Sequence, residues 1–126
     1  MTPYTRTKIL ATADQCVNGD RDHDYGGPER SFDTIAAMWN AYIAHATGAN
    51  VDLGADDVAA MMALLKIVRI ARNPEKMDSW IDLAGYAACG GEIASVNNGV
   101  AAEDDGTRKA TPVLTSAVRG IGGAQK

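Results

Sequence analysis

The sequence has few of the residues that hold a metal ion or a disulfide framework. It contains only two cysteines and two histidines among 126 residues. Cys16 and Cys89 lie far apart, and neither stands at a metal-ligand spacing from another ligand, which argues against a zinc site. We therefore expect two reduced thiols, as in a cytoplasmic protein.

Long apolar runs and a surplus of basic residues are also missing. No stretch approaches the roughly 18 apolar residues that span a bilayer, and the first residues lack the apolar segment of a signal peptide. A net charge of −4 leaves no basic face to displace counterions from a nucleic-acid polymer. These features predict a soluble, cytoplasmic protein with no membrane and no polymeric nucleic acid as partner. A single nucleotide needs only a few local cations and is compatible with this charge.

The pattern that is present is helical. Apolar residues recur at helical spacing, and no strand-like alternation is long enough to count. Helices are predicted over residues 5–17, from a cap at Ser31 to residue 47, over 55–73 and over 77–96. After residue 97 small residues, glycines and charges replace the periodicity. We predict an all-α, four-helix bundle-like domain over 1–96. A flexible or extended tail over 97–126 would carry at most a short helix around 112–119.

The helix over 58–70 is apolar on every side except for two cations, Lys66 and Arg69. Such a helix is expected in the middle of a bundle. At about 100° per residue, both cations point in the same direction as Val58 and Met62. Cations directed into a packed interior need an anionic partner. That partner is either a carboxylate of the next helix or the phosphate of a ligand.

Two carboxylates one turn apart follow on the next helix. Asp78 and Asp82 can share a divalent cation or contact two guanidinium groups. Gly85, one turn further, leaves room for another backbone or a ligand. In the alternative interpretation Asp78 caps the helix, Asp82 is solvated, and the cations of the preceding helix form structural salt bridges.

A second group of polar residues suits a nucleotide. Asn73 continues the stripe of Lys66 and Arg69, and a guanidinium beside an ammonium suits a polyphosphate. In the loop before the second helix, Tyr25 can stack on a base, and the backbone N–H groups around Gly26 can bind an anion. An ordinary Gly-Pro turn with solvated acids explains the loop equally well.

Three segments carry a resemblance to known proteins. They run from Asp20-Arg21 through Tyr25-Gly26-Gly27-Pro28 to Trp39, from Asp57 to Arg69, and from Asp78 to Tyr86. Over residues 5–90 the chain resembles a family of small proteins common in bacteriophages and prophages. More distantly it resembles the all-α MazG-type and dUTPase-type nucleoside triphosphate pyrophosphohydrolases and the nucleotide-modification-associated domains related to them. The MazG-like fold implies a homo-oligomer, and phage origin implies the cytoplasm of the host.

The chain departs from the MazG-type enzymes in its acidic residues. Those enzymes resemble one another in a Glu-Glu-x-x-Glu cluster and a Glu-x-x-Asp motif that together hold magnesium. Here the second motif is Asp78-x-x-x-Asp82, and the nearest acidic pair to the first is Asp56-Asp57. Magnesium is the cofactor that hydrolysis would need, and binding without turnover needs none. Hydrolysis requires the acidic cluster that holds magnesium, whereas nucleotide binding requires the cationic stripe, which this chain retains.

Three functions remain open from the sequence. The first is a nucleotide-binding protein that sequesters a nucleotide, a cyclic nucleotide or a nucleotide-like immune signal of the host without turnover. The second is a magnesium-dependent pyrophosphohydrolase, and the third is a structural or interaction protein. The predicted ligand-binding residues are Lys66, Arg69, Asn73, Tyr25, Gly26 and Tyr86, and the predicted metal ligands are Asp78 and Asp82. Self-association is expected because the large apolar residues, among them Trp39, Met61 and Trp80, exceed what a thin layer of helices hides.

Overall fold

All regular structure is helical in the computed structural model of the chain, which describes residues 2–19 and 28–102. The helices are α1 (Arg6–Asn18), α3 (Pro28–Thr47), α4 (Ala55–Arg72) and α5 (Met77–Asn97). No strand occurs in the described ranges, so the predicted all-α class is confirmed. The short helix predicted around 112–119 lies outside the described residues.

The ends of α3 show one error and one success of the sequence prediction. The helix begins at Pro28, three residues before the predicted cap at Ser31. Proline suits the first turn because its fixed φ is helical and it has no amide hydrogen to leave unpaired. At the other end the helix stops before Gly48 as predicted, and the φ of 77° at this glycine is one that other residues rarely adopt.

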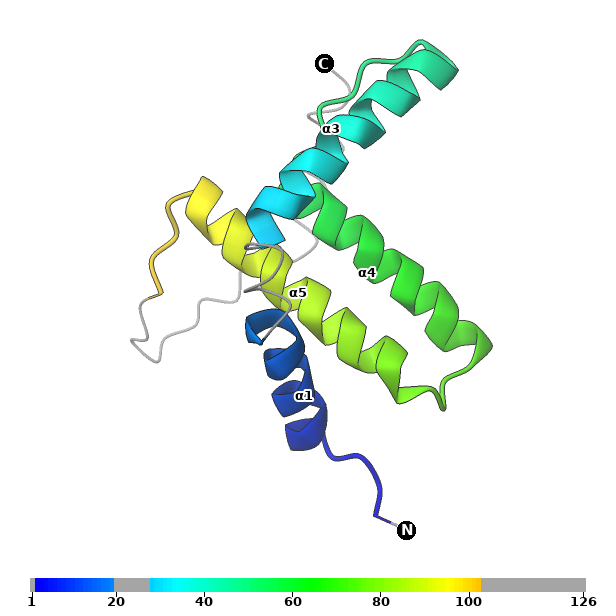
Figure 1. Cartoon of the computed structure of the whole chain (residues 1–126), viewed down its shortest axis with the longest axis vertical. Coiled ribbons are helices and arrows are strands. Elements are labelled where there is room, and N and C mark those ends of the chain that lie inside the picture. Colours follow the sequence, from blue (N-terminus) through cyan, green and yellow to red (C-terminus); the bar gives the residue numbers. More distant parts are fainter. Residues whose placement is uncertain (1, 20–27, 103–126) are drawn as a thin grey trace, which may run out of the picture.

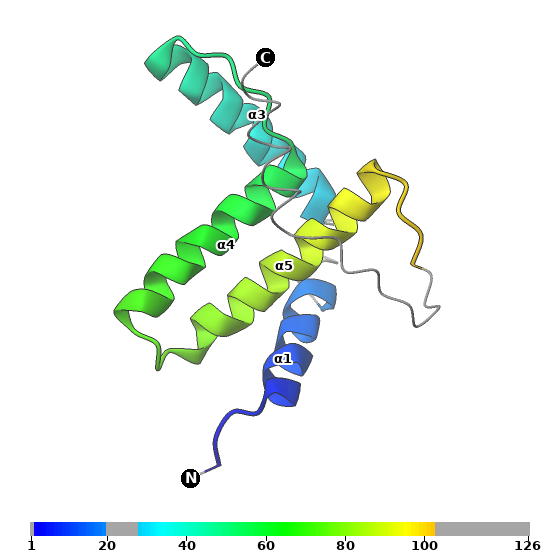
Figure 2. The same ribbon diagram turned by 180° about the vertical axis from the view of Figure 1, so that it is seen from behind.

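The central helix is α5. Figures 1 and 2 show α4 beside it as the other arm of an antiparallel hairpin, with α1 packed on a different side of α5. The buried positions of α5 are Ser79, Ile81, Gly85, Cys89 and Ile93. The sequence predicted that the 58–70 helix would be central, and for the single chain this is wrong. Helix α4 contacts α5 and α3, but these contacts leave Leu64, Ile67 and Val68 exposed.

Small residues let the neighbours of α5 approach closely. A Cβ atom added at Gly90 would lie 2.9 Å from the Cβ of Ala59 on α4. One added at Gly85 would lie 3.2 Å from a methyl carbon of Val17 on α1. The space expected at Gly85 for another backbone or a ligand is therefore used by α1. Shape complementarity at these glycines fixes the positions of both helices against α5.

The start of α3 lies against α4 and α5, its later turns extend away from them, and residues 48–54 return beside it to the start of α4 (Figure 1). Asn40 holds this returning segment. Its side-chain amide donates to the carbonyl oxygen of Leu53 at 3.0 Å, and its carbonyl oxygen accepts from the Leu53 amide at 2.9 Å. Since Leu53 stands two residues before α4, this pair of hydrogen bonds sets where α4 begins.

The core of the described chain is small. Its buried apolar residues include only two fully buried side chains larger than alanine, Ile93 and Val58. Half of the buried set is alanine; the members are Ala13, Ala36, Ala55, Val58, Ala59, Ile81, Cys89 and Ile93. Because the hydrophobic free energy of folding scales with the apolar area removed from water, a core in which half of the residues are alanine provides little stability.

Substitution of the two adjacent glycines of α5 tests the close approach of α4. Gly90→Ala should lower the free energy of unfolding by about 1–3 kcal/mol, because the new methyl group meets the rigid Cβ of Ala59. Gly91→Ala should raise it by about 0.5–1 kcal/mol, because no atom lies within 4 Å of an added Cβ and alanine is the better helix former. Urea denaturation followed by circular dichroism measures both. Equal effects of the two variants would contradict the helix contact.

Candidate functional site in the α4–α5 hairpin

The site predicted from the sequence centres on an ion pair between the two arms of the hairpin. The ammonium group of Lys66 on α4 lies 2.9 Å from a carboxylate oxygen of Asp82 on α5. The Lys66 side chain is 13% exposed and the Asp82 side chain 39% exposed. A cation held in an apolar interface thus meets an anion that still reaches solvent. The contact brings the cationic stripe of α4 and the acidic stripe of α5 together.

The remaining charges of these stripes are exposed. Arg69 was expected to point into the interior with Lys66, but it lies at the surface, as does Asp78. Within the described ranges neither residue takes part in an ion pair. Arg69 is turned about 60° around the helix from Lys66, which is enough to move a side chain from an interface to its edge. The guanidinium group is therefore accessible to a ligand.

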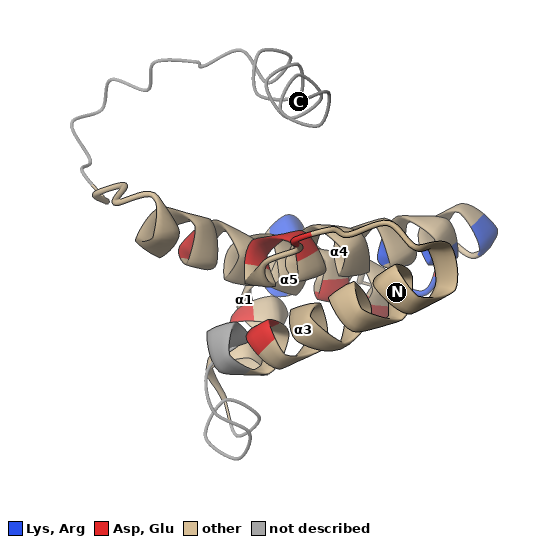
Figure 3. Cartoon of the chain, turned by 90° about the horizontal axis from the view of Figure 1, so that it is seen from above, with Lys and Arg blue, Asp and Glu red and all other residues tan. Residues whose placement is uncertain are grey.

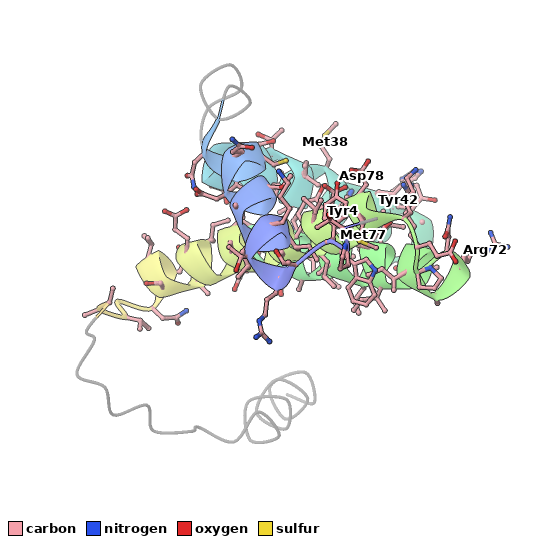
Figure 4. All side chains as sticks on the ribbon, turned by 90° about the horizontal axis from the view of Figure 1, so that it is seen from below. Tyr4, Met38, Tyr42, Arg72, Met77 and Asp78 are labelled. Atoms are coloured by element: carbon pink, nitrogen blue, oxygen red, sulfur yellow. The ribbon has the colours of Figure 1, made fainter. Side chains whose placement is uncertain are left out.

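Further cations lie near the same turn. Arg72 ends α4 and Lys76 precedes α5, and both are exposed. Figure 3 shows the basic segments of α4 gathered toward this end of the hairpin, and in Figure 4 Arg72 lies at its extremity. Arg72 and Lys76 stand outside the stripe of Lys66 and Arg69, so helical spacing did not select them. The signal in the sequence that could have identified these two cations is their proximity to Pro74, where the chain reverses.

Asn73 has a structural role in the turn. Its backbone N–H donates to the Arg69 carbonyl oxygen at 2.9 Å, and its side-chain oxygen accepts from the Glu75 amide at 3.2 Å. The indole N–H of Trp80 donates to the Pro74 carbonyl oxygen at 2.9 Å. These hydrogen bonds close the turn from both sides. Any ligand contact of the Asn73 side chain comes in addition to this role.

The two tyrosines predicted to bind the ligand have different outcomes. The ring of Tyr86 on α5 packs against Phe32 on α3, with centroids 6.1 Å apart and planes tilted by 30°. This contact joins α3 to α5 and leaves Tyr86 partly exposed. Tyr25 and Gly26 lie outside the described residues.

The metal ligands expected from the sequence amount to two carboxylates. Asp78 is exposed, and Asp82 is engaged by Lys66. Among the residues that the structure describes, no three or more His, Cys, Asp or Glu side chains are grouped to hold a metal ion. Cys16 is exposed and Cys89 is buried, and they do not form a disulfide. The hairpin thus presents more groups suited to a phosphate than to a divalent cation.

Residues 8–94 match the family described as Domain of unknown function (DUF6378). The chain belongs to this family. The matched region begins in α1 and ends in α5, and it includes every predicted site residue. It ends well before residues 103–126.

Two phage proteins are similar to this family member. The Gene 55 protein of Mycobacterium phage L5 is 42% identical over 79 residues, which is 63% of this chain and 47% of the phage protein. The Gene 55 protein of Mycobacterium phage D29 is 35% identical over 81 residues, which is 64% of this chain and 50% of its own length. The chain spans about half the length of these curated relatives. No solved structure matches it significantly, and none of the described helices is long and apolar enough to cross a bilayer.

Removal of Asp82 and removal of Lys66 should lower the free energy of unfolding by different amounts. Asp82→Leu leaves the largely buried ammonium group of Lys66 without its anion and should lower the free energy of unfolding by about 1–3 kcal/mol. Lys66→Met leaves a carboxylate that water can solvate, with a loss below about 1 kcal/mol. The double variant should regain most of the stability lost in Asp82→Leu, because replacement of both charges removes the unpaired one.

The matched control is Asp78→Leu, one turn earlier on α5 and without an ion pair. It should change the free energy of unfolding less than Asp82→Leu does. Urea denaturation of all four variants measures these differences. A larger loss for Asp78→Leu than for Asp82→Leu would contradict the structural importance of the ion pair.

Proposed function

We propose that this protein is phage-encoded and binds a nucleotide or cyclic nucleotide at the turn end of the α4–α5 hairpin. Lys66 and Arg69 would bind the phosphates, and Asn73 and Tyr86 would contribute polar and aromatic contacts. Tyr25 and Gly26 would add a base contact and backbone N–H groups. The phage relatives support the first part of the proposal.

The observation that carries the proposal is the unequal pairing of the two cations. Lys66 is held in the interface by Asp82, whereas Arg69 is exposed and has no ion pair among the described residues. A fixed ammonium group and a free guanidinium group one turn apart suit a phosphate chain, since the guanidinium binds two oxygens at once and the ammonium acts as a point charge. The additional exposed cations Arg72 and Lys76 favour the approach of an anion.

Sequestration is better supported than hydrolysis. Magnesium demands near-octahedral coordination and is held by carboxylates together with substrate phosphates. Asp78 and Asp82 would be the protein ligands, but Asp82 already contacts Lys66. A binder that retains a nucleotide, including a nucleotide-like immune signal of the host, needs the cations alone. Hydrolysis remains the second candidate because two carboxylates one turn apart stand beside these cations.

Loss of the exposed guanidinium group tests the binding site. Arg69→Ala should weaken binding about tenfold to a hundredfold, because it removes a charge-assisted contact of about 1.5–3 kcal/mol. The ligand would first be found by thermal denaturation with a panel of nucleotides and cyclic nucleotides, with and without magnesium, because a bound ligand raises the melting temperature. Titration calorimetry then compares the variants. Arg6→Ala removes an exposed arginine of α1 and should bind like the parent; equal losses in both variants would contradict the site.

Sequestration and hydrolysis differ in the fate of the ligand. A sequestering protein releases the ligand intact after denaturation, and its Asp82→Asn variant should still bind. A hydrolase releases pyrophosphate or monophosphate in the presence of magnesium, and Asp82→Asn should abolish the release because the carboxylate charge is gone. Chromatography of the nucleotide after long incubation distinguishes them. Multiple turnover would exclude sequestration, and an intact ligand would exclude hydrolysis of that ligand.

A further inference from the structure

The outer face of α4 is an apolar surface that the described chain leaves open. We define this outer face by Met61, Leu64, Leu65, Ile67 and Val68, whose residues are 39–60% exposed. These five stand within eight consecutive positions, although the exposed large apolar residues of the described chain extend from Tyr4 to Val100. The opposite side of α4, with Ala55, Val58 and Ala59, packs into the core. Concentration of apolar side chains in one stretch of helix marks an interaction surface.

The spacing on this face is that of a helix which pairs with another helix. Met61, Leu64, Val68 and Ala71 follow one another at intervals of three, four and three residues. This interval places side chains along one seam, as in coiled coils and four-helix bundles. Only Asp57 and Arg72 bring charge to the ends of the seam. The outer face therefore fits a helix better than a flat or polar partner.

The charges at the two ends of the seam make it self-complementary. Asp57 in the first turn and Arg72 at the last residue of α4 are both exposed. They are 15 positions apart, which corresponds to about 22 Å along the helix and about 60° around it. If two copies of α4 pack antiparallel about their middle, Asp57 of each copy comes within about one turn of Arg72 of the other. A parallel arrangement would place like charges together.

We infer that the outer face of α4 is the interface of a homodimer in which two α4 helices pack antiparallel around a twofold axis. The occupant is a second copy of this chain. Two observations favour it over the chain's own tail. The family match contains all of α4 and ends at residue 94, so the tail at 103–126 is not part of what the family shares. Half of the buried apolar residues of one copy are alanine, and a second copy would bury large apolar side chains of α4 that the single chain leaves exposed.

Substitution of the seam by a charged residue tests the interface. Leu64→Glu and Val68→Glu each place a carboxylate in the apolar contact and should raise the dimer dissociation constant at least about a hundredfold. The chain offers matched controls with the same residue types: Leu10 is 63% exposed against 60% for Leu64, and Val96 is 63% exposed against 59% for Val68. Leu10→Glu and Val96→Glu should leave the dissociation constant unchanged. Sedimentation equilibrium over a wide range of concentration measures all five proteins.

A measurement on the unmodified chain covers the case in which the seam variants do not fold. The melting temperature of a dimer rises with protein concentration, whereas that of a monomer does not. A monomeric parent, with a melting temperature independent of concentration, overturns the proposal. Dimers that survive Leu64→Glu and Val68→Glu but dissociate in Leu10→Glu or Val96→Glu overturn it as well, because the interface is then elsewhere.

The direction of pairing has its own test. Arg72→Gln removes an attraction in the antiparallel arrangement and should raise the dissociation constant by up to about fivefold, with a smaller effect at high salt. In a parallel arrangement the same change relieves repulsion between two arginines and tightens the dimer, which overturns the antiparallel pairing. Arg6→Gln makes the same change in net charge on α1 and should leave the dissociation constant unchanged.

Discussion

The close packing of α4 against α5 is the constraint on which the rest of the structure depends. Ala59 meets Gly90 at one point of the interface, and Lys66 meets Asp82 at another. The midpoints of both pairs fall at residues 74–75, where the chain turns, so a single antiparallel register satisfies both contacts. The steric contact allows little freedom of rotation, and the ion pair requires the same arrangement. The positions of all other charges near the turn follow from this register.

The register divides α4 into two faces with different physical roles. One face contacts α5 and carries the buried residues together with the cation held by Asp82. The other face carries the largest exposed apolar side chains of the helix. Helix α4 is apolar on every side, and its contacts with α5 and α3 leave part of that apolar surface exposed. In the inferred dimer α4 lies in the middle of a bundle after all, between its own α5 and a second α4.

The proposed ligand site and the inferred dimer interface use different sides of the same hairpin. Lys66 and Asp82 join α4 to α5, whereas the seam from Met61 to Val68 faces away from α5. Arg72 lies at the turn end of that seam, so its charge contributes to both surfaces, whereas Asp57 lies at the far end of α4. At the turn end of the hairpin Arg69, Arg72 and Lys76 are exposed, so a small ligand can reach them.

The sequence by itself determined the helices and most of their ends. Periodic apolar residues, Pro74 and Gly48 are local signals, and local hydrogen bonding and sterics suffice to act on them. The pairing of Lys66 with Asp82 was one of two alternatives that helical geometry allowed. Only the tertiary structure decided that α5 is central, that α1 fills the space at Gly85, and that Arg69 reaches solvent. These outcomes depend on which helix packs against which. The periodicity of a helix shows which sides are apolar but not which neighbour covers them, because hydrophobic contact is non-directional.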